Sequence, residues 1–396
     1  MSIHEYGWSD YWNVFWDQWK QGFEERTGNT QVRPARLIAD YGQKVKLITM
    51  DGERWGVSSG KLRHAVVDPA EMPAVGDWLA ITTPDEVSDA VIHAVLPRKS
   101  RISRQAAGFE TREQLIATNV DTLFLVNALN HDFNMRRLER YLIMAWNSGV
   151  NPVVVLSKSD LCEDVEQRVA EAEGVAPGVP VIVISALQNE GREQLETFLQ
   201  PGSTVALTGS SGSGKSTIVN WLSGSEVQLT QDVREEDSRG RHTTTHRQLF
   251  PIAKQAVLLD TPGMRELNLW DDSMGVAHTF TDIMETAQQC RFADCKHKGE
   301  AGCAVEEAIE RGELSESRVN NYRKMQRELE YQARKEADRR RKDSRSSTTP
   351  GRRDQRSGWL GISEVAGDVM WSGEPNCSEV SNVKIYENLC CSRHMV

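Results

Sequence analysis

Hydrophobic residues recur with three different spacings along the chain, and each spacing predicts its own kind of element. In residues 1–31 the large aromatic side chains are mostly three or four positions apart, which places them on one face of a helix. These residues are Trp8, Trp12, Phe15, Trp16, Trp19 and Phe23. We expect this N-terminal extension to dock on the protein's own surface, and a helix that binds a partner is the alternative.

Short runs of alternating apolar and polar residues follow from 32 to 98, separated by turn signals such as Asp51-Gly52. A period of two indicates strands, and five such runs suit a small β-barrel, for which an oligonucleotide-binding (OB) barrel is one candidate. A purely structural barrel is the alternative. Residues 99–118 are expected to form a basic linker. The side chains here that suit contacts with RNA are Arg98, just before it, and Lys99, Arg101 and Arg104.

Strand-like and helix-like patterns then alternate between residues 119 and 270. This alternation predicts an α/β domain with a parallel sheet covered by helices on both faces. Ligands of such domains lie at the carboxyl ends of the strands. Residues 271–343 are expected to form a helical domain, and residues 344–396, which lack any periodic pattern, a disordered tail.

Composition and charge narrow the class of protein. No apolar run reaches the roughly 18 residues of a membrane span, and the start of the chain has no signal-peptide pattern. We therefore expect a cytoplasmic monomer without membrane contact. The net charge is −10, yet residues 318–356 contain 14 Lys/Arg against 6 Asp/Glu, a local net of +8. This basic segment is either a solvated helix face or an arm that binds a polyanion, and the sequence does not decide between the two.

The segment 209–217, "GSSGSGKST", follows an apolar strand and opens a helix. It matches the phosphate-binding loop G-x-x-x-x-G-K-S. Glycines let backbone N–H groups converge on phosphate oxygens, Lys215 reaches the β- and γ-phosphates, and Ser216 ligates magnesium. The sequence therefore predicts a site for a nucleoside triphosphate with Mg²⁺, and Lys215 is also assigned a catalytic role.

The tetrapeptide "SKSD", residues 157–160, ends an earlier strand. The Asp160 carboxylate can accept hydrogen bonds from guanine N1–H and the 2-amino group, whereas adenine would leave it unpaired. Lys158 can lay its aliphatic stem on the base. The tetrapeptide resembles the guanine-reading element N-K-x-D with Ser157 in place of asparagine, which leaves the affinity for GTP open. "SAL", residues 185–187, resembles the second base-contacting element.

Two further segments complete a GTPase set. "DTPG", residues 260–263, matches D-x-x-G, so that Asp260 would hold magnesium through water and Gly263 would sense the γ-phosphate. "GRHTTTHR", residues 240–247, offers a threonine to magnesium, and we favour Thr244 over Thr243 and Thr245. The residues predicted to bind GTP are Ser157, Lys158, Ser159, Asp160, Ser185, Ala186, Gly209, Ser210, Ser211, Gly212, Ser213, Gly214, Lys215, Ser216, Thr217 and Gly263.

A cysteine cluster follows in "CRFADCKHKGEAGC". Three thiolates and one imidazole within this short span make a closed tetrahedral set, which is typical of a structural zinc ion. Buried cysteines without a metal are the alternative. The predicted zinc ligands are Cys290, Cys295, His297 and Cys303.

The order of these elements is unusual, because the base-reading segments precede the phosphate loop. The sequence is therefore circularly permuted relative to ordinary GTPases. With "GRHTTT", "DTPG", the cysteine cluster and a barrel ending in "VLPRKSRISR", residues 32–343 resemble the RsgA/YjeQ family, the small ribosomal subunit biogenesis GTPases.

This resemblance implies a circularly permuted P-loop GTPase domain with an N-terminal OB-like barrel and a C-terminal helical zinc-binding domain. It also implies that the protein binds the small ribosomal subunit and its rRNA and assists late assembly, with GTP hydrolysis stimulated by the subunit. Met264 stands where many GTPases have a water-orienting glutamine, so intrinsic turnover should be slow. The resemblance favours His242 as the catalytic residue over an ordinary surface histidine.

Two other function classes stay open on the sequence. A P-loop ATPase or kinase would contain S-K-S-D by coincidence and would prefer ATP. A zinc-containing RNA-binding protein with a vestigial nucleotide site is the second, and Ser157 and Met264 are the residues that favour it.

Overall fold

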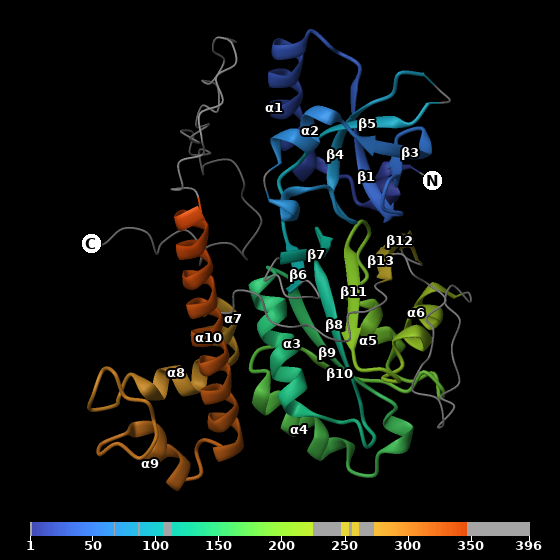
Figure 1. Ribbon diagram of the computed structural model, residues 1–396. Helices are drawn as coiled ribbons and strands as arrows, with labels where there is room; N and C mark the ends of the chain where they lie inside the picture. The colour runs from blue at the N-terminus through green and yellow to red at the C-terminus, as the bar shows by residue number, and fades with distance from the viewer. Residues whose placement is uncertain are drawn as a thin grey trace, which may run out of the picture. The chain divides into compact units, whose positions relative to one another are not determined.

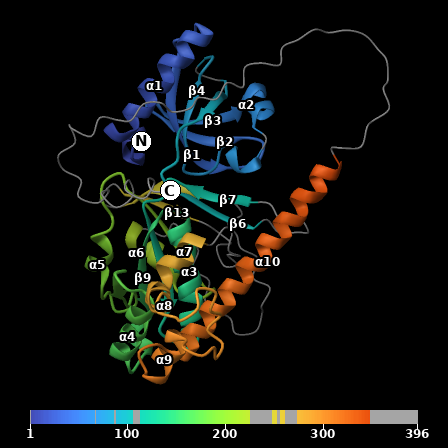
Figure 2. The same ribbon diagram turned by 90° about the vertical axis from the view of Figure 1, so that its left-hand side faces the viewer.

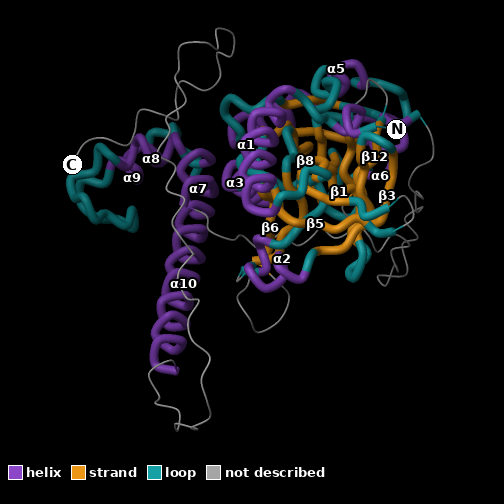
Figure 3. The backbone as a smooth tube through the Cα atoms, turned by 90° about the horizontal axis from the view of Figure 1, so that it is seen from above, coloured by secondary structure: helices purple, strands orange, loops and turns teal. Residues whose placement is uncertain are grey.

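The computed structural model describes residues 2–66, 68–85, 88–105, 113–224, 247–252, 256–260 and 273–346. Eleven strands of these residues form one hydrogen-bonded sheet in the order β10-β9-β8-β11-β13-β12-β1-β2-β3-β5-β4. The first part of the chain closes the far end of this sheet into a barrel, and the middle part forms the parallel region (Figure 1). Helices surround the strands in the view from above (Figure 3).

The barrel is closed because β1 pairs with both β2 and β4. Leu37, Leu47 and Leu79 point inward and are fully buried, as the alternating pattern predicts. The five predicted strands are confirmed. Their bounds, with those of two short helices, are β1 Val32–Asp40, β2 Val45–Thr49, β3 Gly52–Ser58, α2 Gly60–Ala65, η2 Pro69–Glu71, β4 Trp78–Thr82 and β5 Ala90–Val95.

The N-terminal extension forms η1 (Ile3–Tyr6) and α1 (Asp10–Thr27). Its aromatic face packs on the outer wall of the barrel. The rings of Trp8 and Trp12 lie 5.0 and 5.6 Å from that of Trp78 in β4. Docking of the extension on the protein's own surface is confirmed.

The segment predicted as a basic linker is more ordered than expected. Residues 99–118 contain β6 (Arg101–Gln105) and β7 (Glu113–Thr118), which pair as an antiparallel two-stranded sheet. Ile102 is fully buried, but it lies between Arg101 and Ser103, and this single apolar position among polar residues did not indicate a strand. The segment is therefore a folded ribbon with basic side chains. The prediction that Arg98 contacts RNA is wrong, because its side chain is nearly buried and pairs with Asp77 at 2.7 Å.

The parallel sheet has two hydrophobic faces. Leu123, Leu125 and Leu156 pack with α3 and α4 on one face, whereas Phe124 and Val126 pack with α5 and α6 on the other. This double covering confirms the predicted α/β class. The bounds are β8 Thr122–Ala128, α3 Met135–Asn147, β9 Asn151–Ser157, η3 Ser159–Leu161, α4 Val165–Val175, β10 Val181–Val183, α5 Arg192–Glu196, β11 Thr204–Gly209, α6 Lys215–Ser223, β12 Gln248–Pro251 and β13 Val257–Asp260.

Strand β12 joins the barrel to the parallel region. It pairs antiparallel with β13 on one side and with β1 on the other, where Ala39 lies opposite Gln248. A buried arginine reinforces this junction. Arg36 in β1 donates hydrogen bonds to the carbonyl of Tyr6, to the carbonyls of Gly76 and Asn119 at 3.3 Å, and to Thr204 Oγ1 at 2.8 Å.

The C-terminal helices are α7 (Ser273–Thr279), α8 (Thr281–Ala287), α9 (Ala304–Glu310) and α10 (Glu316–Ser346). Helix α7 lies directly against α3, since a Cβ atom added at Gly275 would be 2.3 Å from the Ile143 carbonyl oxygen. Helices α8 and α9 flank the first half of the long α10 (Figure 2). Among the described residues, none of the helices is long and apolar enough to cross a membrane.

Candidate nucleotide and metal sites

The phosphate loop connects β11 to α6, and two glycines determine its shape. A Cβ atom at Gly209 would lie 2.3 Å from the Val126 carbonyl oxygen, which is closer than real Cβ contacts. Gly214, the N-cap of α6, has φ +89°, a conformation that favours glycine. The loop therefore requires glycine where the phosphate-loop pattern has it.

The Lys215 ammonium lies inside this loop. Its Nζ donates hydrogen bonds to the carbonyls of Gly209 and Ser210 at 2.8 and 2.5 Å, and lies 3.4 Å from Ser213 Oγ. Lys215 is also the first residue of α6, whose N-terminus favours anions. A cation and a helix N-terminus at one point make this loop suitable for phosphate groups.

The base-reading segment lies against the phosphate loop. Ser157 Oγ, at the end of β9, donates to the Ser213 carbonyl at 2.7 Å. Asp160 accepts a hydrogen bond from Ser185 Oγ at 2.6 Å, so the S-K-S-D and S-A-L segments meet at this carboxylate. Lys158 has φ +60° and forms the tight turn from β9 into η3, which places Asp160 at this position. Two segments far apart in the sequence thus share one site with the loop.

The other predicted nucleotide residues are only partly within the described chain. Asp260 is the last residue of β13, the strand beside β11. His242, Thr244 and Gly263, together with Met264, lie outside the described residues.

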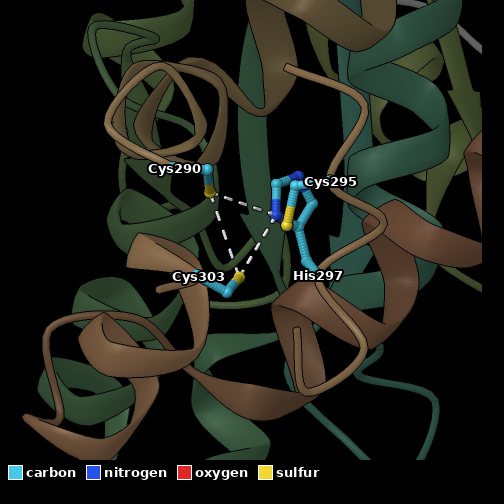
Figure 4. A group of neighbouring side chains, drawn as sticks. All are labelled: Cys290, Cys295, His297 and Cys303. Atoms are coloured by element: carbon cyan, nitrogen blue, oxygen red, sulfur yellow. Dashed lines mark hydrogen bonds between the residues drawn. The ribbon is translucent and has the colours of Figure 1, made fainter. Parts of the chain in front are cut away.

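The four predicted metal ligands come together at one point between α8 and α9 (Figure 4). Their ligand atoms all lie within 4.8 Å of one another. Cys290 Sγ is 3.9 Å from Cys303 Sγ, and these sulfurs are 3.6 and 3.5 Å from His297 Nδ1. Tetrahedral ligands at the usual zinc bond lengths are about 3.8 Å (S–S) and about 3.6 Å (S–N) apart. The donor set and its geometry fit a structural zinc ion.

Burial shifts the pKa of two members of this cluster. Burial raises the pKa of the Cys295 thiol to about 11, and the thiols of Cys303 and Cys290 add to the rise. Burial lowers the pKa of His297, and the charge of Arg323 lowers it further. The imidazole is therefore held neutral, as a metal ligand must be.

A second layer of contacts supports the cluster, and the motif did not reveal it. Arg323 of α10 donates to the His297 carbonyl and forms an ion pair with Glu306 of α9 at 2.5 Å. Glu300 accepts the backbone N–H groups of Lys296 and Lys298 at 3.1 and 2.5 Å. These contacts fix the loop that carries His297, whose φ is +55°.

Comparison with known sequences identifies the family of the chain. The family described as RsgA GTPase matches residues 95–270. The chain is 44% identical over 303 residues to the small ribosomal subunit biogenesis GTPase RsgA 1 of Oceanobacillus iheyensis, covering 76% of this chain and 86% of that protein. The chain belongs to the RsgA GTPase family. This RsgA-family GTPase is also 46% identical over 297 residues to RsgA 2 of Vibrio parahaemolyticus, covering 75% and 79%.

Solved structures support the same assignment. YjeQ from Thermotoga maritima is 29% identical with a TM-score of 0.57, and the match covers 75% of this chain and 98% of YjeQ. YloQ, described as a circularly permuted GTPase, shares the fold with a TM-score of 0.52 and 21% identity, covering 76% and 96%. The fold of this RsgA-family GTPase is therefore circularly permuted, as the order of its motifs predicts.

The sequence analysis missed one residue at the nucleotide site. Asp132, in the loop between β8 and α3, accepts a hydrogen bond from Ser210 Oγ of the phosphate loop. The available signal was its position just beyond the carboxyl end of β8, which lies beside β11. Polar residues at that edge of a parallel sheet favour a functional role.

Proposed function

We propose that this RsgA-family GTPase binds the small ribosomal subunit in the cytoplasm as a monomer, assists its late maturation and hydrolyses GTP faster when bound there. The names of its relatives support the partner. The observation that carries the nucleotide choice is the contact between Asp160 and Ser185 beside the phosphate loop. This contact holds a carboxylate at the end of β9, where a base would lie.

Guanine recognition is assigned to Asp160 and Lys158. The Asp160 carboxylate would accept the N1–H and 2-amino hydrogens of guanine, and the Lys158 stem would cover the base. Ser185 would orient the carboxylate. Ser157 is assigned to the phosphate loop, because its hydroxyl bonds the Ser213 carbonyl and so joins the base-reading segment to that loop.

Hydrolysis requires charge stabilisation on the phosphates and an oriented water. The loop N–H groups and Lys215 would stabilise part of the phosphate charge. Mg²⁺ would neutralise further charge, and the oxygen atoms of Ser216, Thr244 and Asp260 would hold it. We assign the orientation of water to His242, since Met264 cannot do it. Gly263 would contact the γ-phosphate.

RNA binding is assigned to the barrel, the β6–β7 ribbon and the basic half of α10. Exposed Arg334 and Lys335 lie on that half, and phosphate contacts from such side chains supply most of the affinity for a nucleic acid. A zinc ion held by the Cys290 cluster would keep the base of α10 rigid through Arg323.

The test measures GTP and ATP hydrolysis with and without purified small subunits. We expect stimulation by the subunit with GTP only. Asp160→Asn should lower the GTP preference about 10- to 100-fold, the value of hydrogen bonds to a charged group. Asp164→Asn, four residues away with no side-chain cap bond, is the matched control.

The alternatives give different results. An ATP preference insensitive to Asp160→Asn would favour an ATPase or kinase. RNA binding that is indifferent to nucleotide would favour a vestigial site. Equal and unstimulated rates with both nucleotides would contradict the proposal.

A further inference from the structure

The start of α3 is joined to the phosphate loop by Asp132. Its carboxylate accepts the Ser210 hydroxyl and lies 2.9 Å from the Arg137 guanidinium. Arg137 belongs to the first turn of α3 and also donates to the Asp132 carbonyl. Asn134 caps the helix by accepting the Arg137 N–H at 3.1 Å. Asp132 is therefore fixed to the helix on one side and to the phosphate loop on the other.

Ser210 is also the residue whose bonding a triphosphate would change. Its carbonyl accepts the Lys215 ammonium at 2.5 Å. Phosphate oxygens would compete for that ammonium, because the lysine of such a loop binds the β- and γ-phosphates. When the Lys215 ammonium turns to the phosphates, the Ser210 carbonyl loses this hydrogen bond. The position of Ser210 then depends more on the hydrogen bond from its hydroxyl to Asp132.

The next turn of α3 is joined to the C-terminal helices. Glu139, which is almost fully buried, lies 2.8 Å from the Arg318 guanidinium of α10 and accepts a hydrogen bond from Asn321. Arg318 also reaches Asp282 of α8 at 2.8 Å. A buried charge pair of this kind is costly to break, so α3 and these helices are expected to move together.

A second, more exposed ion pair lies one residue further along α3. Arg140 donates to both carboxylate oxygens of Glu328 at 2.8 and 3.0 Å. About a third of each side chain is exposed. Charge reversals are therefore tolerable at this pair, whereas they would unfold the buried one.

We propose that Asp132 is a positioning residue of the phosphate loop, and that α3 transmits the bonding state of Ser210 to α8 and α10. A short rigid helix held at both contacts can carry such coupling. The inference rests on the proposed function, in which α10 binds RNA, and supplies a route by which the nucleotide alters that binding. By linkage, RNA bound to α10 would alter nucleotide affinity by the same factor.

The test is amide hydrogen exchange of residues 281–331 in the full-length protein, without ribosomal subunits. Exchange with GDP is compared with exchange in a non-hydrolysable GTP analogue, at saturating nucleotide. We expect a difference between the two nucleotides in the natural protein, reduced at least threefold by Asp132→Ala. Ser210→Ala should reduce the exchange difference by the same factor. The double variant Asp132→Ala with Ser210→Ala should reduce it no further, since each single variant removes the same hydrogen bond.

Charge reversal at the Arg140–Glu328 pair distinguishes a contact that transmits the nucleotide state from one that only stabilises the helices. Arg140→Glu should reduce the nucleotide-dependent difference, since only the buried Glu139–Arg318 pair would still join α3 to α10, and Arg140→Glu with Glu328→Arg should restore it. The matched control is Lys20→Glu, which breaks the exposed pair with Glu24 on α1 and should leave the difference unchanged.

No difference between the nucleotides in the natural protein, or one that Asp132→Ala leaves intact, would overturn the inference. A failure of the proposed function would look different. The exchange difference would persist, while small subunits would neither bind the protein nor stimulate hydrolysis.

Discussion

At the scale of single residues, hydroxyl groups do much of the positioning in the nucleotide site. Ser157 Oγ holds the Ser213 carbonyl, and Ser185 Oγ holds Asp160. A serine where the base-reading pattern has asparagine is therefore a tether to the phosphate loop. The pattern alone left the role of Ser157 open, because spacing identifies the segment but not the partner of its first side chain.

Ser157→Ala should weaken GDP binding about fivefold. It removes a hydrogen bond of roughly 1 kcal/mol and loosens the phosphate loop relative to the base site. Titration with a fluorescent GDP analogue measures the change. Ser203→Ala removes an equivalent hydroxyl-to-carbonyl bond (Ser203 Oγ to Gln200, 2.7 Å) away from the site and should have no effect. Unchanged affinity in Ser157→Ala would show that the tether does not support binding.

At the scale of elements, hydrophobic period predicted the barrel strands, the parallel sheet and the aromatic helix. It failed for β6, β7 and β12. Strand β6 has a single buried apolar residue, Ile102, between Arg101 and Ser103, and β12 has only four residues, including Pro251. Strand β12 pairs with the sequence-distant β1, and β6 pairs with β7; local apolar periodicity does not reveal which segments pair. The contact of Asp132 with Ser210 was inaccessible for the same reason.

Removal of metal should unfold the region around α8 and α9 while the nucleotide site persists. The Cys290–Cys303 loop has few apolar contacts of its own, so binding of the metal supplies much of its folding free energy. Chelation should lower helix content in circular dichroism and leave GDP affinity within about twofold, RT ln 2 being about 0.4 kcal/mol. Cys295→Ser should reproduce the effect. Retention of full helicity after complete metal removal would contradict it.

Replacement of Arg334 and Lys335 by glutamine should weaken RNA binding and reduce its salt dependence. Each lost phosphate contact lowers the slope of log K against log salt by about 0.7–0.9. Binding to small-subunit RNA at several salt concentrations gives the slope. Arg168→Gln on α4 serves as the control. An unchanged slope in the double variant would remove this half of α10 from the RNA interface.

At the scale of the whole molecule, Arg36 ties four separate segments together. Its guanidinium bonds the N-terminal extension, the barrel, the segment after β7 and the start of β11. Burial lowers its pKa to about 10, so the charge persists at neutral pH. The sequence pattern predicts that a charged residue in the middle of a strand is exposed to solvent, whereas Arg36 is almost fully buried.

Arg36→Met should destabilise the protein by about 3 kcal/mol or more, because it leaves several buried carbonyl groups without donors. Urea unfolding followed by tryptophan fluorescence measures the loss. The control is Arg33→Met, on the same strand as Arg36. It removes only an exposed ion pair with Asp51 and should change the free energy of unfolding by less than about 1 kcal/mol. Equal effects of the two variants would contradict the role of Arg36.

The pairing of β1 with β12 also governs how the molecule tolerates being cut. A fragment beginning at residue 119 would keep every nucleotide-binding motif and lose β1. The backbone groups of β12 that now face β1 would become an open sheet edge, and such edges recruit strands from other molecules. The isolated catalytic region should therefore aggregate during expression, and one role of the barrel is to cover this sheet edge.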